Sequence, residues 1–250
     1  MKFISIQASA FKAVFEVLKD ILNDVNVYFK PSGIRIITLD TARTALVDMF
    51  LSAENFEEYS CPEDVIAGIN IANTFKLLKT ITNSDTITMT INNKEFIEIV
   101  IKNDTKKTVT KFQLKLLDIN EDQIELPEIE MSVVTTMQSI DFQRICRDMN
   151  NIASEVRVTR TNKQFIIECS GDFANQNTAI DCMDNTCSSS ESLSGLYSLK
   201  YLNIFTKATG MCSTVQILQE QENRFLVLKY NVANLGELKF YLATKVEDGG

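Results

Sequence analysis

Apolar residues recur along this chain at two spacings, which divide it into helices and strands. From residue 10 to residue 22, a stripe that includes Phe11, Phe15 and Leu18 follows the helical repeat. The same kind of spacing predicts further helices over 72–82, 141–152 and 198–209. Alternation with a period of two, rich in β-branched residues, predicts short strands, among them 4–6, 34–36, 86–91, 96–101, 165–167 and 225–230. Helices that cover one face of antiparallel sheets belong to the α+β class.

This pattern occurs twice. The stripe that starts at Phe11 returns 131 positions later from Phe142, and the segment that ends at Lys79 returns 128 positions later at Lys207. Solenoid repeats are about 20 to 50 residues long, so a period of this length indicates a duplicated domain. We therefore predict two similar domains, each with two helices packed on antiparallel sheets. Their limits are 1–117 and 135–250, with a connector over 118–134.

Charge is distributed unevenly along the chain. The formal net charge is −8, but the four predicted helices together carry +4 and the remaining residues −12. The stretch 118–130 at the start of the connector holds six acids and no base. Its simplest interpretation is a solvated linker, although its apolar residues leave a docking role open. A protein with a negative net charge does not bind nucleic acid through its overall charge, so any contact with DNA depends on where its cations lie.

The chain lacks histidine and the glycine motifs on which many enzymes depend. It has no histidine, and its eight glycines form no phosphate-binding motif. Its six cysteines contain no C-x-x-C pair and are expected to be reduced core thiols. We expect no enzyme activity, metal site or cofactor. A metal-dependent nuclease built on the acidic pairs is the least supported alternative. No apolar run is long enough to span a membrane and no signal peptide is evident, so a soluble intracellular protein is expected.

The predicted helices present lysines opposite their apolar stripes. Lys12 and Lys19 lie seven positions apart on one face, and Lys76 and Lys79 lie three apart. On a single helix such lysines usually form only a solvated face. The repetition of these basic faces across the helices of an otherwise acidic chain favours a functional role for the lysines over a merely solvated surface. Separated point charges without interleaved aromatic residues suit contact with phosphates and no reading of base sequence.

Three segments resemble the proliferating cell nuclear antigen family of DNA sliding clamps. They are the helix from Phe142 to Met149, the segment from Lys200 to Thr209, and the C-terminal stretch from Leu235 to Asp248. The resemblance covers essentially the whole chain in order. It implies a DNA-clamp fold in which three identical chains close head to tail into a homotrimeric ring around double-stranded DNA. The helices would line the central hole.

The resemblance also implies three sets of site residues. The residues that would face DNA are Lys12, Lys19, Lys76, Lys79, Arg147, Lys200 and Lys207. The edge strands that would join neighbouring subunits include Val109, Thr110 and Phe112 on one side and Phe173, Asn175 and Asn177 on the other. The pocket for partner peptides would comprise Leu39, Arg43, Leu46, Ile124, Leu126, Pro127, Phe225, Tyr241, Leu242, Ala243 and Thr244.

The sequence departs from the family at several of these positions. Phe225 and Thr244 stand where prolines are common, and Arg43 replaces a frequent histidine at the rim of the pocket. Ala13 replaces a second basic residue of the first helix. The lysine that the family modifies falls on Asn162, beside Lys163.

The implied function is a processivity factor for DNA polymerase and a docking platform for replication and repair. Its partners would be DNA polymerase, a clamp loader, flap endonuclease, DNA ligase and other proteins that carry the clamp-interacting peptide motif. The expected location is the nucleus, or a viral replication compartment if the chain is viral. The alternative is a diverged checkpoint-type or viral clamp that acts as a heteromer or as a smaller oligomer.

Overall fold

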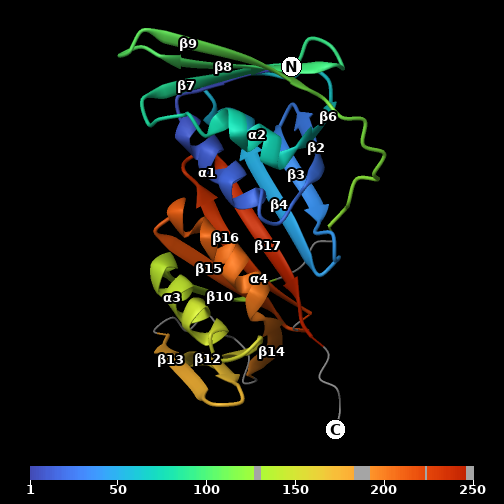
Figure 1. Cartoon of the computed structure of the whole chain (residues 1–250). Helices are drawn as coiled ribbons and strands as arrows, with labels where there is room; N and C mark the ends of the chain where they lie inside the picture. The colour runs from blue at the N-terminus through green and yellow to red at the C-terminus, as the bar shows by residue number, and fades with distance from the viewer. Residues whose placement is uncertain (127–130, 183–191, 223, 246–250) are drawn as a thin grey trace. The chain divides into compact units, whose positions relative to one another are not determined.

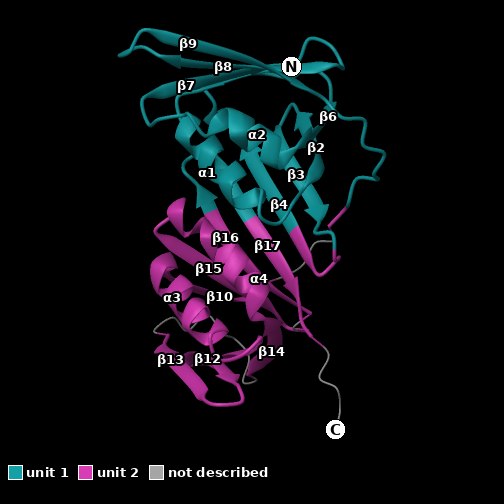
Figure 2. Ribbon diagram, in the orientation of Figure 1, with its two compact units in different colours: residues 1–41, 47–124, 231–238 teal, residues 42–46, 125–230, 239–250 magenta. Residues whose placement is uncertain are grey.

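The computed structural model describes residues 1–126, 131–182, 192–222 and 224–245. The chain divides into two compact units, coloured separately in Figure 2. Unit 1 comprises residues 1–41, 47–124 and 231–238, and unit 2 comprises residues 42–46, 125–230 and 239–250. The predicted limits of the two domains and the connector stay predictions.

Unit 1 contains two antiparallel sheet regions and two helices that lie side by side (Figure 1). One region has the strand order β5-β1-β7-β8-β9, and the other has the order β4-β3-β2-β6. The elements are β1 (Lys2–Ser5), α1 (Ala8–Leu18), β2 (Asp24–Lys30), β3 (Gly33–Leu39), β4 (Ala45–Ser52), the 3-10 helix η1 (Ala53–Asn55), β5 (Glu58–Ser60), β6 (Val65–Asn70), α2 (Ile71–Leu78), β7 (Asp85–Thr90), β8 (Phe96–Asn103) and β9 (Thr108–Lys115).

Unit 2 has the same kinds of parts, and its helices also lie together. Its sheet regions have the orders β10-β15-β16-β17 and β13-β12-β11-β14. The elements are β10 (Met131–Gln138), α3 (Ser139–Asn150), β11 (Glu155–Arg160), β12 (Gln164–Ser170), β13 (Asn175–Asp181), β14 (Leu193–Ser198), α4 (Leu199–Phe205), the 3-10 helix η2 (Thr206–Gly210), β15 (Thr214–Glu220), β16 (Phe225–Val232) and β17 (Gly236–Ala243).

The duplication predicted from the sequence is visible in this topology. The order β1-β7-β8-β9 matches β10-β15-β16-β17, and β4-β3-β2-β6 matches β13-β12-β11-β14. Residues 86–89 lie in β7 and residues 214–217 in β15, which are equivalent strands. The predicted α+β class is therefore confirmed, with two α-helices and two antiparallel sheet regions among the described residues of each unit.

The predicted helices are present, but their ends differ from the predicted ones. α1 ends at Leu18 rather than at residue 22, because the chain continues in tight turns in which the amides of Ile21 and Leu22 both donate to Leu18 O. These turns keep Leu22 in the core, which extends the apolar stripe beyond the helix. The fourth helix is shorter than predicted, since α4 tightens into η2 after Phe205. Ile6, predicted within a strand, lies outside β1 and is 61% exposed.

Aromatic side chains of the helices and of neighbouring strands pack together in each core. In unit 1, the ring of Phe11 on α1 stacks on Phe3 with centroids 5.3 Å apart. In unit 2, Phe205 on α4 stacks on Phe240 of β17 at 4.5 Å, and Tyr230 meets the same ring edge-on at 6.3 Å. Such pairs add about 0.5–1.5 kcal/mol beyond the burial of their surface. They fix each helix pair on its sheet.

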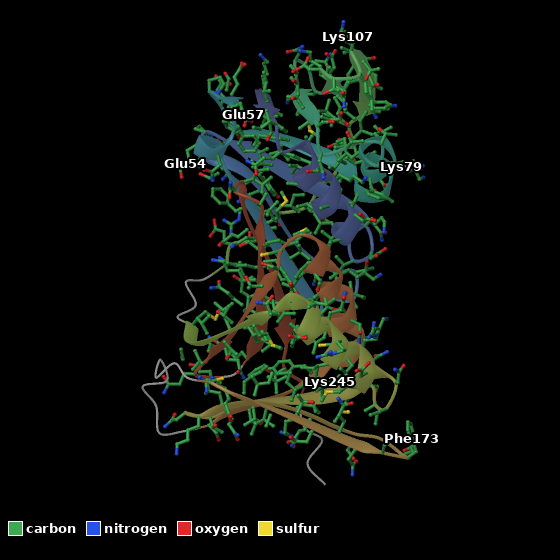
Figure 3. The ribbon with its side chains drawn as sticks, turned by 90° about the vertical axis from the view of Figure 1, so that its left-hand side faces the viewer. Glu54, Glu57, Lys79, Lys107, Phe173 and Lys245 are labelled. Carbon is green, nitrogen blue, oxygen red and sulfur yellow. The ribbon has the colours of Figure 1, made fainter. Side chains whose placement is uncertain are left out.

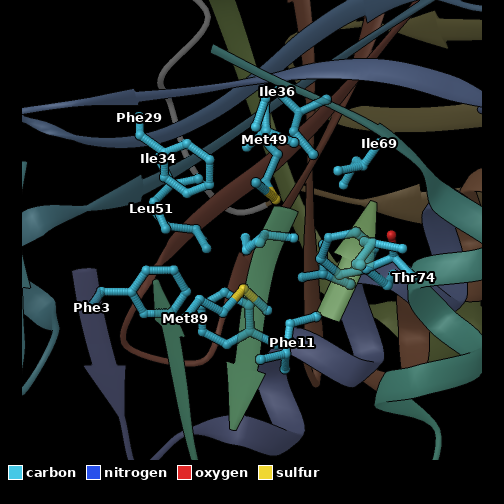
Figure 4. Close-up of a pocket in the computed structure, with 17 residues that line it drawn as sticks. Phe3, Phe11, Phe29, Ile34, Ile36, Met49, Leu51, Ile69, Thr74 and Met89 are labelled. Carbon is cyan, nitrogen blue, oxygen red and sulfur yellow. The ribbon is translucent and has the colours of Figure 1, made fainter. Parts of the chain in front are cut away.

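Unit 1 encloses a small cavity of about 30 Å³ among these side chains (Figure 4). Apolar groups such as Phe3, Phe11 and Met89 line it, and the polar Thr74 directs its hydroxyl to Asn70 O at 2.8 Å. A small apolar cavity without polar partners stays dry. We therefore interpret it as a packing defect of the core and not as a ligand site.

The cysteines follow the predicted pattern in part. Cys61, Cys146 and Cys169 are buried free thiols, as predicted, and burial raises the pKa of the Cys146 thiol. Cys182 and Cys212 are also free but only half-buried, so they are not core residues. Cys187 lies outside the described residues.

Candidate functional site

Two of the predicted DNA-facing lysines in unit 1 are engaged inside the helix pair. Lys12 on α1 is half-buried, and its Nζ donates to Ile81 O at 3.2 Å. The Nζ of Lys19 lies 3.2 Å from Asp20 Oδ1 and 5.3 Å from the centre of the Phe75 ring. A cation over an aromatic face is attracted by the ring quadrupole. Both lysines therefore help to hold α1 against the region of α2.

The other two predicted DNA-facing lysines of unit 1 are exposed. Lys76 lies in the last turn of α2, where its Nζ donates to Asn73 Oδ1 at 3.0 Å. Lys79 is the C-terminal cap of α2, and Figure 3 shows its side chain extending away from the ribbon. A cation at this end of a helix is favoured by the helix dipole. The position thus suits a lysine structurally while leaving its ammonium available to an anion.

In unit 2 the predicted cations are all exposed. Arg147 lies in the last turn of α3, with its Nε 3.7 Å from Asp148 Oδ1, and its side chain is 67% exposed. Lys200 lies in α4 and Lys207 in η2. Arg144 on α3, which the prediction omitted, is also exposed at 63% and pairs with Asp141 at 3.1 Å. Because α3 packs against α4 and η2, these cations come from one helix pair.

The first helix of each pair carries, at an equivalent position, a side chain that donates to a backbone carbonyl near the end of the second helix. Lys12 in unit 1 reaches a backbone carbonyl just after α2, and Gln143, at the equivalent position of α3, donates its Nε2 to Thr206 O at 2.8 Å. A neutral amide thus makes the contact in one unit and an ammonium makes it in the other. The side chain of Lys12 is therefore held by a contact within unit 1, whereas that of Lys79 extends away from the ribbon.

The predicted subunit-interface residues lie on or beside two edge strands. β9 is the last strand of its sheet region in unit 1, and along it Val109 is 57% exposed while Phe112 is half-buried. β13 is the last strand of its region in unit 2. Asn175 and Asn177 on β13 are exposed, and Phe173, just before the strand, is 76% exposed. An open edge presents unpaired backbone groups to another chain.

Most residues of the predicted peptide pocket belong to unit 2. There, Ala243 N donates to Thr44 O at 3.3 Å and Thr244 N to Arg224 O at 2.9 Å, which ties the end of β17 to the segment beside Arg43 and to the start of β16. Phe225 and Tyr241 are half-buried. Among the remaining pocket residues, Leu46, Leu126, Leu242 and Ala243 also lie in unit 2, Leu39 and Ile124 lie in unit 1, and Pro127 lies outside the described residues.

The structure gives a reason for the threonine at position 244. Its backbone N–H donates to Arg224 O, and its Oγ1 lies 3.3 Å from the hydroxyl of Tyr197. Proline has no N–H and could not make the first of these bonds. The N–H of Thr244 thus ties the residue after β17 to the residue before β16, a bond that a proline at position 244 could not make.

Sequence reasoning missed the residues that anchor the start of the connector. Leu117 N donates to Gly68 O at 2.8 Å, and Asn26 Nδ2 donates to Ile119 O at 3.1 Å. A side chain at position 68 would clash, because its Cβ would lie 2.3 Å from Leu117 O. A glycine inside a strand signals such a close approach of another backbone segment. Gly68 within β6 was such a signal, but the sequence did not show that Leu117 is the segment that approaches it.

Within the described residues there is no cluster of three or more histidine, cysteine or acidic side chains that could hold a metal ion. None of the helices among these residues is long and apolar enough to cross a membrane.

Comparison with known proteins agrees with this architecture. The family model described as "Proliferating cell nuclear antigen, N-terminal domain" matches residues 3–125, and the one described as "Proliferating cell nuclear antigen, C-terminal domain" matches residues 125–245. A similar protein is the "Probable DNA polymerase sliding clamp 1" of Paramecium bursaria Chlorella virus 1. It is 39% identical over 248 residues, which cover 96% of this chain and 94% of that protein. The chain therefore belongs to the proliferating cell nuclear antigen family.

Proposed function

We propose that this protein is a DNA sliding clamp and a processivity factor for DNA polymerase, which works as a homotrimeric ring around duplex DNA. The observation that carries the proposal is the match of both halves to one clamp family. The exposed cations of each helix pair support it, because they are separated point charges on the helices and on the residues that directly follow them. Arg147, which pairs with Asp148 at 3.7 Å, still has 67% of its side chain exposed. Such charges contact phosphates without reading the sequence.

The cations that carry the DNA contact are the exposed ones. In this proposal Lys76, Lys79, Arg147, Lys200 and Lys207 face the duplex, while Lys12 and Lys19 contribute less because they are engaged within unit 1. The contact need not be tight, since a closed ring is retained on DNA by its topology. The acidic remainder of the chain disfavours binding through other surfaces.

Charge reversal tests the DNA contact. A variant with Lys76, Lys79, Arg147 and Lys207 all changed to Glu should keep its assembly state but support shorter products in primer extension by a clamp-dependent polymerase. The matched control changes Lys2, Lys30, Lys94 and Lys163 to Glu, which alters the charge equally outside the helix pairs. Product lengths that are equal for the two variants would refute the assignment.

The assembly state is tested by native mass. A homotrimer has about three times the chain mass of 28.2 kDa. A persistent monomer or dimer at micromolar concentration would contradict ring closure. It would favour the alternative, a diverged checkpoint-type or viral clamp that works as a heteromer or as a smaller oligomer. The observation that favours a viral clamp within this alternative is that the similar protein comes from a virus.

We further propose that the unit 2 residues of the predicted pocket bind the clamp-interacting motif of DNA polymerase, the clamp loader, flap endonuclease and DNA ligase. An aromatic anchor in an apolar pocket is the usual energetic centre of such binding. Leu126→Ala combined with Tyr241→Ala should weaken a motif peptide by at least about 1–2 kcal/mol in calorimetry. Ile140→Ala, an exposed apolar position on α3, is the control. Equal affinity of the double variant and wild type would place the peptide elsewhere.

The location and regulation of the clamp are part of the same proposal. It would act in the nucleus, or in a viral replication compartment if the chain is viral. Residue 162 is asparagine, so modification at the family's site would require the neighbouring Lys163, which is exposed. The expectation that the chain has no enzyme activity stays a prediction.

A further inference from the structure

The β8–β9 hairpin of unit 1 is basic, although the chain outside the helices is acidic overall. Residues 94–115 contain six lysines and three acids. Lys102 pairs with Asp104 at 2.7 Å. Four other lysines are exposed, and within the described residues none of them has an acid at ion-pair distance; they are Lys106, Lys107, Lys111 and Lys115. Their charge is therefore available to an anion.

The two strand lysines share one face of the hairpin with an exposed aromatic ring. Three alternate isoleucines of β8 are buried, so the residues between them and Phe96 point to the opposite, outward face. In the strand register Lys115 lies directly opposite Phe96, and Lys111 lies opposite Val100. Residues that oppose each other in an antiparallel pair lie on the same face, with Cβ atoms about 4.5–5.5 Å apart. Phe96, Lys111 and Lys115 therefore all point outward.

The ring of Phe96 is what distinguishes this face from an ordinary solvated one. Phe96 is 37% exposed, and Asn93 Oδ1 fixes the backbone before it by accepting from the N–H groups of Glu95 and Phe96 at 3.0 and 3.2 Å. A single exposed apolar side chain needs no explanation. An exposed ring beside a lysine is different, because the ring can stack on a nucleic-acid base while the ammonium contacts a phosphate.

The turn between β8 and β9 holds the other two lysines in place. Lys106 N donates to Asn103 Oδ1 at 2.7 Å. Asn103 is only 4% exposed, and its amide also donates to the buried carboxylate of Asp85. Lys107 has a φ of 54°, a left-handed conformation that residues other than glycine rarely adopt. Figure 3 shows its side chain extending away from the ribbon at the end of the hairpin. A buried network thus fixes the backbone that carries these lysines.

We propose that this face of the hairpin binds single-stranded DNA, at a surface separate from the two helix pairs. We call it the basic hairpin face; it comprises Phe96, Lys106, Lys107, Lys111 and Lys115. At ~3.4 Å per residue it extends for about 27 Å along β9. The choice of DNA over RNA rests on the proposed function with DNA polymerase, which copies a single-stranded template. The face itself does not depend on that function or on assembly, since all its residues lie in unit 1.

The aromatic ring favours single-stranded DNA over two other anions. In a duplex the bases are stacked on one another and have no free face for Phe96, and an acidic peptide has no bases at all. Only an unpaired strand uses the ring and the lysines together. Glu98 lies on the same face and is half-buried, which reduces the attraction for any anion. The contact is therefore expected to be weak and dependent on salt.

Fluorescence anisotropy of a labelled oligothymidylate of about 20 nucleotides tests the inference, because single-strand sites cover about 4–16 nucleotides. Each phosphate contact with a single strand contributes about −0.7 to the slope of log K against log salt, so the four lysines together contribute about −3. A variant with all four lysines of the face changed to Gln should lose this contribution. It should also bind at least about tenfold more weakly at ~50 mM NaCl.

Two milder variants separate the face from the predicted subunit edge on β9. Lys106→Gln with Lys107→Gln changes only the turn and should remove about half of the contribution to the slope. Phe96→Ala should weaken binding at least about fivefold and leave the slope unchanged, because it removes stacking and no charge. Neither change should alter the native mass. The same oligonucleotide annealed to its complement should bind equally to wild type and Phe96→Ala.

Matched controls lie elsewhere in unit 1. Lys2→Gln with Lys30→Gln removes two exposed lysines away from the hairpin, and Ile66→Ala shortens an exposed apolar side chain of β6. Both should bind the single strand as wild type does. Phe96→Ala should also weaken binding when it is added to the charge-reversed helix variant, which shows that the ring acts independently of the helix pairs.

Two results would overturn the inference. Equal binding of oligothymidylate by wild type and the four-lysine variant would show that the face does not hold nucleic acid. A loss in the four-lysine variant but none in Phe96→Ala, with equally tight binding of an oligoglutamate peptide, would make an acidic protein segment the occupant. Neither result bears on the proposed clamp function, which fails instead if charge reversal on the helices leaves the lengths of the primer-extension products unchanged.

Discussion

Gly68→Ala is expected to release the start of the acidic connector from unit 1. Glycine at this position lets the chain after β9 pass directly over β6, where Leu117 N donates to Gly68 O at 2.8 Å. An alanine Cβ would lie 2.3 Å from Leu117 O and 3.0 Å from Ile119 Cγ1. The first distance is far below any real contact and involves a backbone oxygen, so the backbone has to move.

The size of the effect follows from the bonds that this movement breaks. Displacement of residues 117–119 removes the bond between Leu117 and Gly68 and the 3.1 Å bond from Asn26 Nδ2 to Ile119 O. Asn26 is only 8% exposed, so its amide would lose its partner in a place that water scarcely reaches. At about 0.5–1.5 kcal/mol for each bond, the expected loss is about 1–3 kcal/mol.

Hydrogen exchange and urea unfolding measure the two parts of this loss. The amide of Leu117 should exchange faster in Gly68→Ala, and the midpoint of urea unfolding should fall. The matched control is Gly210→Ala in η2, because a Cβ there would have no neighbour within 4 Å. Removing glycine at such a site is neutral or slightly stabilising. If the two alanine variants have the same exchange rates and the same urea midpoint, then Gly68 does not position the connector.

Four further predictions concern single groups. Lys12→Ala should lower the free energy of unfolding by about 1 kcal/mol, because it removes an ammonium hydrogen bond to a backbone carbonyl. Lys79→Ala should change the free energy of unfolding by less than about 0.5 kcal/mol. It should reduce the slope of log K for duplex DNA against log salt by about 0.9 per lost phosphate contact. Equal losses of unfolding free energy for Lys12→Ala and Lys79→Ala in urea titrations would contradict the assignment of a structural role to Lys12 and a DNA-binding role to Lys79. Because burial raises the pKa of Cys146, iodoacetamide should modify it only after unfolding, and rapid modification of the native protein would place it outside the core. The pKa of Asp85 is lowered, since burial is outweighed by hydrogen bonds such as the 2.7 Å bond from Thr82 N; its stabilisation is therefore present above about pH 4 and is lost as the pH falls through the folded pKa. Thermal unfolding of Asp85→Asn should accordingly depend less on pH between about 5 and 2 than that of wild type, and parallel curves would exclude this role.

Much of the architecture was determined by the sequence alone. The stripes beginning at Phe11 and Phe142 placed two equivalent helices because helical periodicity is a local property of the chain. The same residues then appear in the cores of units 1 and 2. The repeat at about 130 positions identified the duplication, and the matching strand orders of the two units confirm it. Exact helix ends were less predictable, since they depend on the turns that follow, as at Leu18.

The chemistry of individual cations was decided only by the tertiary structure. Lys12 and Lys79 look alike in the sequence, because both lie opposite an apolar stripe. In the fold, Lys12 reaches a carbonyl of another segment, whereas the side chain of Lys79 extends away from the ribbon. The anchoring of Leu117 at Gly68 is similar, since it joins positions 49 residues apart. Periodicity reports which face of its own element a side chain occupies. Contacts between distant segments depend on how the elements pack, which no local pattern of residues encodes.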